Sequence, residues 1–343
     1  MSQHVFHLGA TAPQLATPFG ARTAMRSDDF PILDRLSLAR LTIEPRGFRE
    51  PHWHANANEL GYCLRGRLLV TVFADPNRHA SFTISAGEMF FVPSGALHAI
   101  ENVGPDQAEL IIAFSHEQPQ DFGLSGSVSM LTANVVGNTL GLAAGQLAGL
   151  RKGTDDIFAG QVDGPPELDP AAGYPDDLKL DLEGLAPRID NQYGVLKTAR
   201  LDTWPALDQL AMYSLRITGK GMREPHWHPV TAELGYLHAG RARMTVRSDD
   251  GSVDTYELGP GDAYFIPRAF PHHIENLADH EEAHFLIFFD QPEVHDIGYT
   301  GSAGALARRV LAPTLGLSAA ELPELPEMPA DLLIVEKRNP VDP

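Results

Sequence analysis

The sequence contains one cysteine and no long apolar run. Cys63 is the only cysteine among 343 residues, so no intrachain disulfide can form. No stretch reaches the roughly 20 apolar residues that a membrane-spanning helix needs. Residues 1–24 lack the basic segment followed by an apolar one that marks a secretory signal. These absences exclude a disulfide-rich scaffold and a helical membrane protein, and we expect a cytoplasmic protein.

Basic residues are scarce relative to acidic ones. The chain has 26 Lys and Arg against 45 Asp and Glu, which gives a formal net charge of −19. A field of that sign repels nucleic acids and anionic membrane surfaces, so neither is an expected partner. Any site for a small anion must therefore be locally positive.

Two peptides recur in the sequence at one constant distance. The segment Arg49-Glu-Pro-His-Trp-His54 returns 174 residues later as Arg223-Glu-Pro-His-Trp-His228. The segment Glu59-Leu-Gly-Tyr62 returns at the same distance as Glu233-Leu-Gly-Tyr236. A repeat of this length indicates a duplicated domain. We therefore predict an N-terminal barrel over 1–160, an irregular connector over 161–197 and a C-terminal barrel over 198–343.

Each copy reads as a series of short strands. Residues 68–73, 89–92 and 109–114 are apolar runs or alternations bounded by turn residues, and their counterparts recur in the second copy. The abundance of Gly (31) and Pro (27) fits many turns. Short strands at this spacing are typical of an all-β sandwich or barrel. Short helices are expected after each barrel, over 128–142 and 303–311.

Each copy also carries four side chains of the types that bind metals. A His-x-His pair on a strand directs both imidazoles to one face, here the barrel interior. A glutamate follows five residues later, and a third histidine comes from another strand. The two sets are His52, His54, Glu59 and His98, and His226, His228, Glu233 and His272.

Three imidazoles and a carboxylate suit a divalent transition metal: Mn, Fe, Co, Ni, Cu or Zn. Four protein ligands on a six-coordinate ion leave two positions open, which indicates chemistry or ligand binding. A single His-x-His pair would be a chance occurrence in most sequences. The recurrence of all four ligand types at one spacing makes chance a poor explanation.

The pattern resembles the two motifs of the cupin superfamily. The first motif is met in both copies, with Gly66 and Gly240 completing it, and the second is met by Gly87, Pro93, Gly95, His98 and Asn102. The second copy departs once, since Ala269 stands where the motif has glycine. The resemblance implies two tandem germin-like jelly-roll β-barrels, one metal ion in each, and a homo-oligomer.

Among duplicated cupins the chain is most similar to oxalate decarboxylases. Arg49 and Arg223 each lie three residues before the first ligand histidine. The resemblance implies that these arginines bind the carboxylate of a small substrate, that the metal is Mn(II), that dioxygen takes part, and that oxalate is cleaved to formate and CO2. A guanidinium binds a carboxylate through two parallel hydrogen bonds. The alternative is a structural ion pair with Glu50 or Glu224.

One departure concerns the proton donor. The family's acid is a Glu in a Ser-Glu-Asn-Ser lid, and no such tetrapeptide occurs at residues 115–123. By position, Asp121 and, in the second copy, Asp296 are the nearest substitutes. The alternative for these segments is a solvated turn.

Other functions stay open at this point. The same scaffold carries oxalate oxidases, dioxygenases and isomerases, and it also forms non-catalytic proteins that bind a metal or a small ligand. The sequence does not say which barrel is catalytic.

Overall fold

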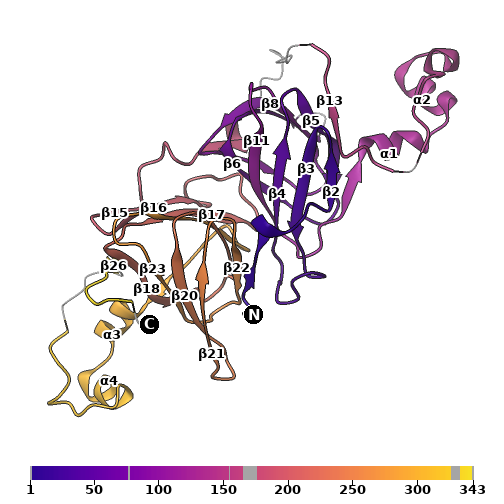
Figure 1. Cartoon of the computed structure of the whole chain (residues 1–343). Coiled ribbons are helices and arrows are strands. Elements are labelled where there is room, and N and C mark those ends of the chain that lie inside the picture. The colour runs from indigo at the N-terminus through magenta and orange to yellow at the C-terminus, as the bar shows by residue number, and fades with distance from the viewer. Residues whose placement is uncertain (1, 76–77, 154, 165–175, 326–332, 342–343) are drawn as a thin grey trace. The chain divides into compact units, whose positions relative to one another are not determined.

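The chain consists of two units, each built from a pair of antiparallel sheets. The computed structural model describes residues 2–75, 78–153, 155–164, 176–325 and 333–341. The first unit contains Thr11–Gly184 and Trp204–Leu210, and the second contains Met1–Ala10, Leu185–Thr203 and Ala211–Pro343. Strands dominate both (Figure 1), so the expected all-β architecture is confirmed.

In the first unit, a seven-stranded sheet faces a six-stranded one. In spatial order, the larger sheet contains β14 (Lys179–Asp181), β9 (Glu88–Val92), β6 (Glu59–Arg65), β11 (Ala108–Phe114), β4 (Ser37–Ile43), β3 (Gly20–Met25) and β2 (Leu15–Thr17). The smaller sheet contains β12 (Asp121–Gly123), β5 (Gly47–His54), β10 (Leu97–Asn102), β7 (Arg67–Asp75) and β8 (Arg78–Ser85), with β13 (Ala159–Gln161) also paired to β5.

The second unit repeats this plan. Its larger sheet contains β1 (Val5–Phe6), β22 (Ala263–Ile266), β19 (Glu233–Ala239), β24 (Ala283–Phe289), β17 (Ala211–Ile217), β16 (Gly194–Ala199) and β15 (Ile189–Asn191). Its smaller sheet contains β21 (Val253–Leu258), β20 (Ala242–Arg247), β23 (His272–Asn276), β18 (Gly221–Trp227) and β25 (Ile297–Gly298), with β26 (Ile334–Glu336) also paired to β18.

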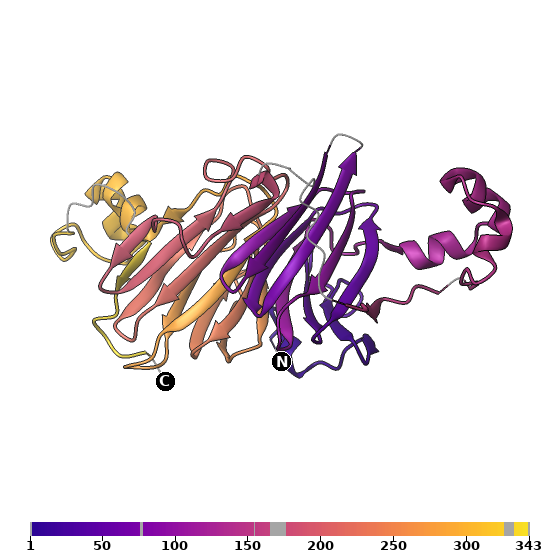
Figure 2. The same cartoon turned by 90° about the horizontal axis from the view of Figure 1, so that it is seen from above.

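Helices are short and follow each pair of sheets, as expected. They are α1 (Leu124–Ser129), α2 (Ala133–Leu140), α3 (Tyr299–Ala305) and α4 (Arg308–Thr314), with single 3-10 turns at Leu8–Ala10, Ala144–Leu147 and Asp176–Leu178. Figures 1 and 2 show α2 standing clear of the strands of its unit, whereas α1 begins directly after β12 and contacts β5. None of the helices in the described ranges has the length and apolarity to cross a bilayer.

The predicted domain boundaries need correction at the N-terminus. Residues 1–160 were expected to form one barrel, but Met1–Ala10 groups with the second unit. There β1 pairs with β22, the amide of Phe265 donates to the carbonyl of His4, and Leu8 is fully buried. These contacts cover an otherwise open sheet edge. A two-residue strand carries too little periodicity to be assigned from sequence.

The expected connector, 161–197, is also more regular than predicted. Within it, β14 extends the sheet of the first unit beside β9, while β15 and the first part of β16 belong to the second unit. Residues 165–175 of this segment lie outside the described residues.

Glycines at one position in each unit make room for a large ring beside a glutamate. A Cβ atom on Gly61 would lie 2.1 Å from the Phe90 ring, and one on Gly235 would lie 2.1 Å from the Tyr264 ring. Both glycines lie two residues after a predicted metal ligand, Glu59 or Glu233, and so point to the same face of the strand. The missing side chain therefore leaves the space that the ring occupies in each unit.

We predict that Gly61→Ala destabilises the first unit. The new methyl group would displace the buried Phe90 ring, and overpacking of this kind costs about 1–3 kcal/mol. Urea unfolding monitored by circular dichroism measures the change. Gly145→Ala is the matched control, because its Cβ would have no heavy atom within 4 Å. Equal unfolding midpoints for the two variants would contradict the packing argument.

Candidate metal centres

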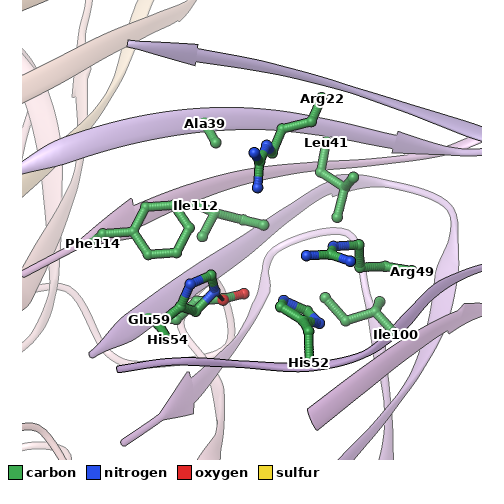
Figure 3. Close-up of a pocket in the computed structure, with 10 residues that line it drawn as sticks. All are labelled: Arg22, Ala39, Leu41, Arg49, His52, His54, Glu59, Ile100, Ile112 and Phe114. Carbon is green, nitrogen blue, oxygen red and sulfur yellow. Dashed lines mark hydrogen bonds and ion pairs between the residues drawn. The ribbon is translucent and has the colours of Figure 1, made fainter. Parts of the chain in front are cut away.

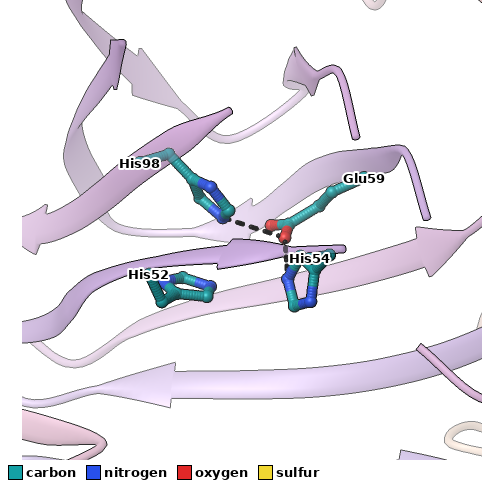
Figure 4. Close-up of side chains that lie close together, drawn as sticks. All are labelled: His52, His54, Glu59 and His98. Carbon is teal, nitrogen blue, oxygen red and sulfur yellow. Dashed lines mark hydrogen bonds and ion pairs between the residues drawn. The ribbon is translucent and has the colours of Figure 1, made fainter. Parts of the chain in front are cut away.

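The first quartet of predicted ligands converges inside the first unit. His52 and His54 come from β5, Glu59 begins β6, and His98 lies on β10. All four are at most 3% exposed, and one ligand atom from each lies within 4.8 Å of the others. Figure 4 shows the imidazoles of His54 and His98 directed at the Glu59 carboxylate, with Nε2–Oε2 distances of 2.9 and 3.1 Å.

Backbone carbonyls determine which imidazole nitrogen faces inward. Nδ1 of His52 lies 2.8 Å from the carbonyl of Glu50, and Nδ1 of His98 lies 3.0 Å from that of Ala96. A carbonyl oxygen only accepts, so each Nδ1 carries a proton and Nε2 is the nitrogen of each ring that faces the centre. Imidazole nitrogens and a carboxylate therefore converge on one point, which is the arrangement that a divalent cation completes.

The protonation states also fit a metal. Burial, together with the charges of His98 and Arg49, lowers the pKa of His52 well below its usual value. Burial alone would raise the pKa of Glu59, but His98 and His54 outweigh it and hold the pKa well below its usual range. A neutral imidazole and an ionised carboxylate are the forms that bind metals. The residues present therefore fit a divalent ion.

The second quartet repeats this geometry. Nε2 of His228 and Nε2 of His272 lie 2.8 and 3.3 Å from Oε2 of Glu233. Nδ1 of His226 lies 2.8 Å from the carbonyl of Glu224, and Nδ1 of His272 lies 2.9 Å from that of Phe270. All four side chains are buried. The structure thus brings together both predicted quartets, one in each unit.

The second oxygen of each ligand carboxylate has a different environment in the two units. The hydroxyl of Tyr264 donates to Oε1 of Glu233 over 2.6 Å. Phe90 occupies the equivalent position in the first unit, and Oε1 of Glu59 is buried without a hydrogen-bond partner among the described residues. The duplicated sites therefore share their four ligands and differ in the group behind one of them.

A bulge in the ligand strand places an arginine in the same pocket. Residues three apart on a regular strand face opposite ways, but the pairing of β5 with β10 shifts register between the partners of Arg49 and His52. Pro51 lies within this interval, and proline is tolerated at bulges because it lacks an N–H. The same shift occurs between Arg223 and His226. Both arginines are consequently buried beside the imidazoles.

Each arginine is paired with the aspartate that the sequence analysis predicted as the acid. One Nη of Arg49 donates to both carboxylate oxygens of Asp121, over 2.7 and 2.8 Å. Arg223 donates to Asp296 over 2.5 Å. The alternative partner, Glu50, lies 3.8 Å from Arg49. The structure therefore joins the two predicted catalytic residues of each copy in one ion pair.

Glu50 and Glu224 have another task, which is to anchor the segments that return to the ligand strand. Glu50 accepts hydrogen bonds from the backbone amides of Phe158 and Ser125, over 2.7 and 3.1 Å. Glu224 accepts from the amides of Leu333 and Thr300, both over 2.9 Å. Ser125 and Thr300 lie in the first turns of α1 and α3. These buried carboxylates tie the start of each helix to the metal-ligand strand.

The electrostatics keep Asp121 ionised in this conformation. Burial alone would raise the pKa of Asp121, but Arg49, His54 and Arg22 outweigh it and lower the pKa to about 2. A carboxylate in this state accepts hydrogen bonds and does not supply a proton at neutral pH. The role of Asp121 as the acid stays a prediction, and it requires the pair with Arg49 to open.

The pocket over the first quartet contains a second arginine that the sequence analysis missed. Figure 3 shows the guanidinium groups of Arg22, on β3, and Arg49, on β5, both pointing into this pocket. Arg22 donates to Asp121 over 2.5 Å. The pocket over the first quartet is lined by Arg22, Ala39, Leu41, Arg49, His52, His54, Glu59, Ile100, Ile112 and Phe114.

The corresponding pocket of the second unit is lined by Leu196, Tyr213, Leu215, Arg223, His226, His228, Glu233, Ile274, Ile287 and Phe289. Leu196 takes the place of Arg22, and Tyr213 takes the place of Ala39. The signal was available in the repeat, since Arg22 and Leu196 are also 174 residues apart.

The model of the family described as Cupin matches residues 6–147 and 181–322. The chain belongs to the cupin family. The match occurs twice and takes in all eight ligands, so this cupin is a duplicated one, with one metal-binding His and Glu set in each unit.

Known relatives of this cupin act on oxalate. Oxalate decarboxylase OxdC of Bacillus subtilis (strain 168) is 28% identical over 278 residues, which cover 78% of this chain and 71% of that protein. Oxalate oxidase GF-2.8 of Triticum aestivum is 33% identical over 116 residues, which cover 32% of this chain and 52% of that protein. A solved structure of the B. subtilis decarboxylase, with Mn(II) centres, superposes with a TM-score of 0.85 at 24% identity, over 98% of this chain and 90% of that one. This likeness confirms the predicted cupin fold.

We predict that Asp121 stabilises the fold in a pH-dependent way. Its folded pKa of about 2 lies below its ordinary 3.8, so its stabilisation is complete above pH 4 and is lost as the pH falls through 2. A shift of this size corresponds to about 2 kcal/mol. The destabilisation caused by Asp121→Asn should therefore shrink by that amount between pH 5 and pH 2, as measured by urea unfolding. A difference between Asp121→Asn and the unaltered protein that stays constant from pH 5 to pH 2 would refute the prediction.

A second prediction concerns the group behind the ligand glutamate. Tyr264→Phe leaves Oε1 of Glu233 without its donor, and loss of such an outer partner typically costs about tenfold or more in metal affinity. We expect this loss at the second site alone, measured by chelator competition with Mn(II). The first site of the same chain is the internal control, because Phe90 already occupies that position. Equal weakening of both sites, or of neither, would show that the hydroxyl does not act on the metal site.

Proposed function

We propose that this cupin is an oxalate decarboxylase-like enzyme that converts oxalate to formate and CO2 with a divalent ion, Mn(II), in each unit. The observation that carries the proposal is the buried arginine beside each ligand quartet, Arg49 or Arg223, in a chain whose net charge is −19. A buried cation on the wall of a metal pocket provides the local positive charge that a small carboxylate needs. The oxalate-active relatives support the choice of substrate.

The metal would be held by His52, His54, Glu59 and His98 in the first unit and by the equivalent four residues in the second. When bound, Mn(II) supplies Lewis-acid polarisation of the substrate carboxylate and one-electron redox chemistry. Every other contribution comes from the chain itself.

Arg49 binds and orients the substrate. Its guanidinium is already aligned for a carboxylate, because Asp121 receives two hydrogen bonds from it. A substrate carboxylate of the same shape can replace Asp121 at this position. Asp121 then loses the partner that contributes most to its low pKa, and its affinity for a proton rises.

The reaction needs one proton to change position. The oxalate monoanion gives formate and CO2 when its C–C bond breaks and its proton ends on the formyl carbon, with no net oxidation. Leu41, Ile100 and Ile112 line the first pocket with apolar surface, which limits water around this carbon. We assign the transfer of this proton to Asp121, once released, and to Asp296 in the second unit.

A second candidate function is oxalate oxidation, in which dioxygen is consumed and peroxide is formed. The specific observation in its favour is the ionised state of Asp121, since a pocket without a proton donor cannot complete formate. Under either function, dioxygen as a reactant, homo-oligomerisation and a cytoplasmic location are predictions that rest on the resemblance and the composition.

We predict that the Mn(II)-loaded protein, incubated with oxalate in air, produces formate and CO2 in equal amounts without peroxide. Arg49→Lys and Arg223→Lys should each keep the metal content and lower the kcat/KM contributed by that unit about tenfold or more. A lysine cannot bind the carboxylate while it also holds the backbone carbonyl of Phe158 or Leu333, as the planar guanidinium does. Product analysis and elemental analysis provide the measurements.

The exposed Arg46 supplies the control, Arg46→Lys, which should leave kcat/KM unchanged. Stoichiometric peroxide would establish the oxidase instead. Unchanged kinetics in both the Arg49 and the Arg223 variants would remove the basis for a carboxylate substrate.

A further inference from the structure

A phenylalanine with a left-handed backbone lies where the chain returns to the ligand strand of the first unit. Phe158 has a φ angle of 61°, in a region that bulky L-residues rarely occupy. The amide of Ala159 donates to the carbonyl of Ile157 over 2.8 Å, so Phe158 is the central residue of a γ-turn, in the rare form with positive φ. Such strain persists only where neighbouring contacts impose it, and it is concentrated at functional sites.

Three hydrogen bonds tie the backbone of Phe158 to β5. Its amide donates to Oε1 of Glu50 over 2.7 Å, and its carbonyl accepts from the amide of Glu50 over 2.9 Å. The same carbonyl accepts from Nη1 of Arg49 over 3.2 Å, whereas Nη2 of Arg49 donates to Asp121. The two Nη atoms of Arg49 therefore have different partners. When a substrate carboxylate displaces Asp121 from one of them, Phe158 still holds the other.

The ring of Phe158 adds a second contact to the same guanidinium. The centre of this ring lies 4.9 Å from Cζ of Arg49 and 5.8 Å from Cζ of Arg22. The face of an aromatic ring attracts a cation, and the attraction is stronger where water is excluded. Phe158 is 5% exposed and Arg49 is 4% exposed, so this contact is dry. The carbonyl and the ring together restrict both the position and the plane of the Arg49 guanidinium.

The second unit has the same backbone arrangement without the ring. Leu333 has a φ angle of 57°, and its amide donates to Oε1 of Glu224 over 2.9 Å. Its carbonyl accepts from the amide of Glu224 and from Nη1 of Arg223, both over 3.0 Å. A leucine side chain has no π face for a cation. The carbonyl contact is thus common to both units, and the ring contact belongs to the first.

We propose that Phe158 is a positioning residue for carboxylate binding in the first unit, because its carbonyl and its ring hold the Arg49 guanidinium in the orientation that a carboxylate needs when it replaces Asp121. Phe158 is not part of the pocket lining and acts through Arg49. The inference rests on the proposed function for the role of Arg49 and adds the residue that prepares this arginine.

The test measures formate binding at the first unit. The background protein carries His226→Ala and His228→Ala, which confine Mn(II) to the first unit, and formate is titrated into the Mn(II)-loaded protein while the electron paramagnetic resonance spectrum of the ion is recorded. Phe158→Leu removes the ring and keeps the backbone contacts, since the second unit places a leucine in this conformation. Phe158→Tyr keeps the aromatic face. Phe73→Leu removes an exposed ring from the same unit and is the matched control.

We expect Phe158→Leu to weaken formate binding about tenfold, because the buried guanidinium loses its π face. Phe158→Tyr and Phe73→Leu should stay within about twofold of the background protein. Circular dichroism and Mn(II) content establish that Phe158→Leu is folded; if it is not, Phe158→Met fills more of the space without a π face and should show the same loss. Unchanged formate affinity without the ring, or no formate binding by the background protein, would overturn the proposal.

A double-mutant cycle separates positioning of Arg49 from a general effect on the fold. Arg49→Gln removes the guanidinium, so adding Phe158→Leu to it should change formate affinity by less than about twofold. An equal loss with and without the guanidinium would contradict a role through Arg49. Oxalate turnover is assayed separately in the unaltered chain. A protein that shows this dependence on Phe158 but does not cleave oxalate would retain the inference and lose the proposed function.

Discussion

The burial of two carboxylates among six imidazoles is the constraint on which the rest of the structure depends. An ionised carboxylate inside a jelly roll is costly unless it is paired. Glu59 and Glu233 are each paired with two imidazole nitrogens, and Glu233 also accepts a hydrogen bond from Tyr264. The surrounding backbone keeps this arrangement in place. Carbonyl oxygens orient the Nδ1 protons, the bulges at Glu50-Pro51 and Glu224-Pro225 turn both the arginine and the histidines inward, and Gly61 and Gly235 admit a ring behind each glutamate. A divalent ion completes the set, and its binding free energy becomes part of the folding free energy.

Duplication preserved the metal ligands while the walls around them diverged. Tyr264 supports Glu233 through a hydrogen bond that Phe90 cannot make to Glu59, and Arg22 supplies a charge that Leu196 does not. Ligand position depends on strand geometry that both copies share, whereas wall residues can change without disturbing the strands. The same fold can therefore contain two sites with one kind of metal chemistry and different preferences for what binds beside it.

The sequence was sufficient to predict the metal ligands, because their chemistry is encoded in spacing. His-x-His on a strand has one geometric meaning, and its recurrence removed the alternative of chance. The pairing of Arg49 with Asp121 was not predicted, since the two residues lie on different strands and only the fold places Asp121 opposite His54. Arg22 was missed for the same reason, although a comparison of the two copies shows that this position differs, with Leu196 in the second copy. The pairing of β1 with the sheet of the second unit could not be predicted, because a strand of two residues shows no periodicity.

The pairing of each arginine with an aspartate has a different consequence in each unit. A carboxylate that binds Arg49 would break the Arg49–Asp121 pair but leave Asp121 beside Arg22. The Arg22 guanidinium would then still stabilise the negative charge of Asp121. A carboxylate arriving at Arg223 would leave Asp296 beside the hydroxyl of Tyr213, which is neutral at physiological pH because burial and Asp296 raise the pKa of Tyr213 above its usual range. The released aspartate would thus stay beside a cation in the first unit and beside a neutral hydroxyl in the second. This difference follows from two substitutions, Arg for Leu and Ala for Tyr, at positions that the duplicated strands otherwise hold in common.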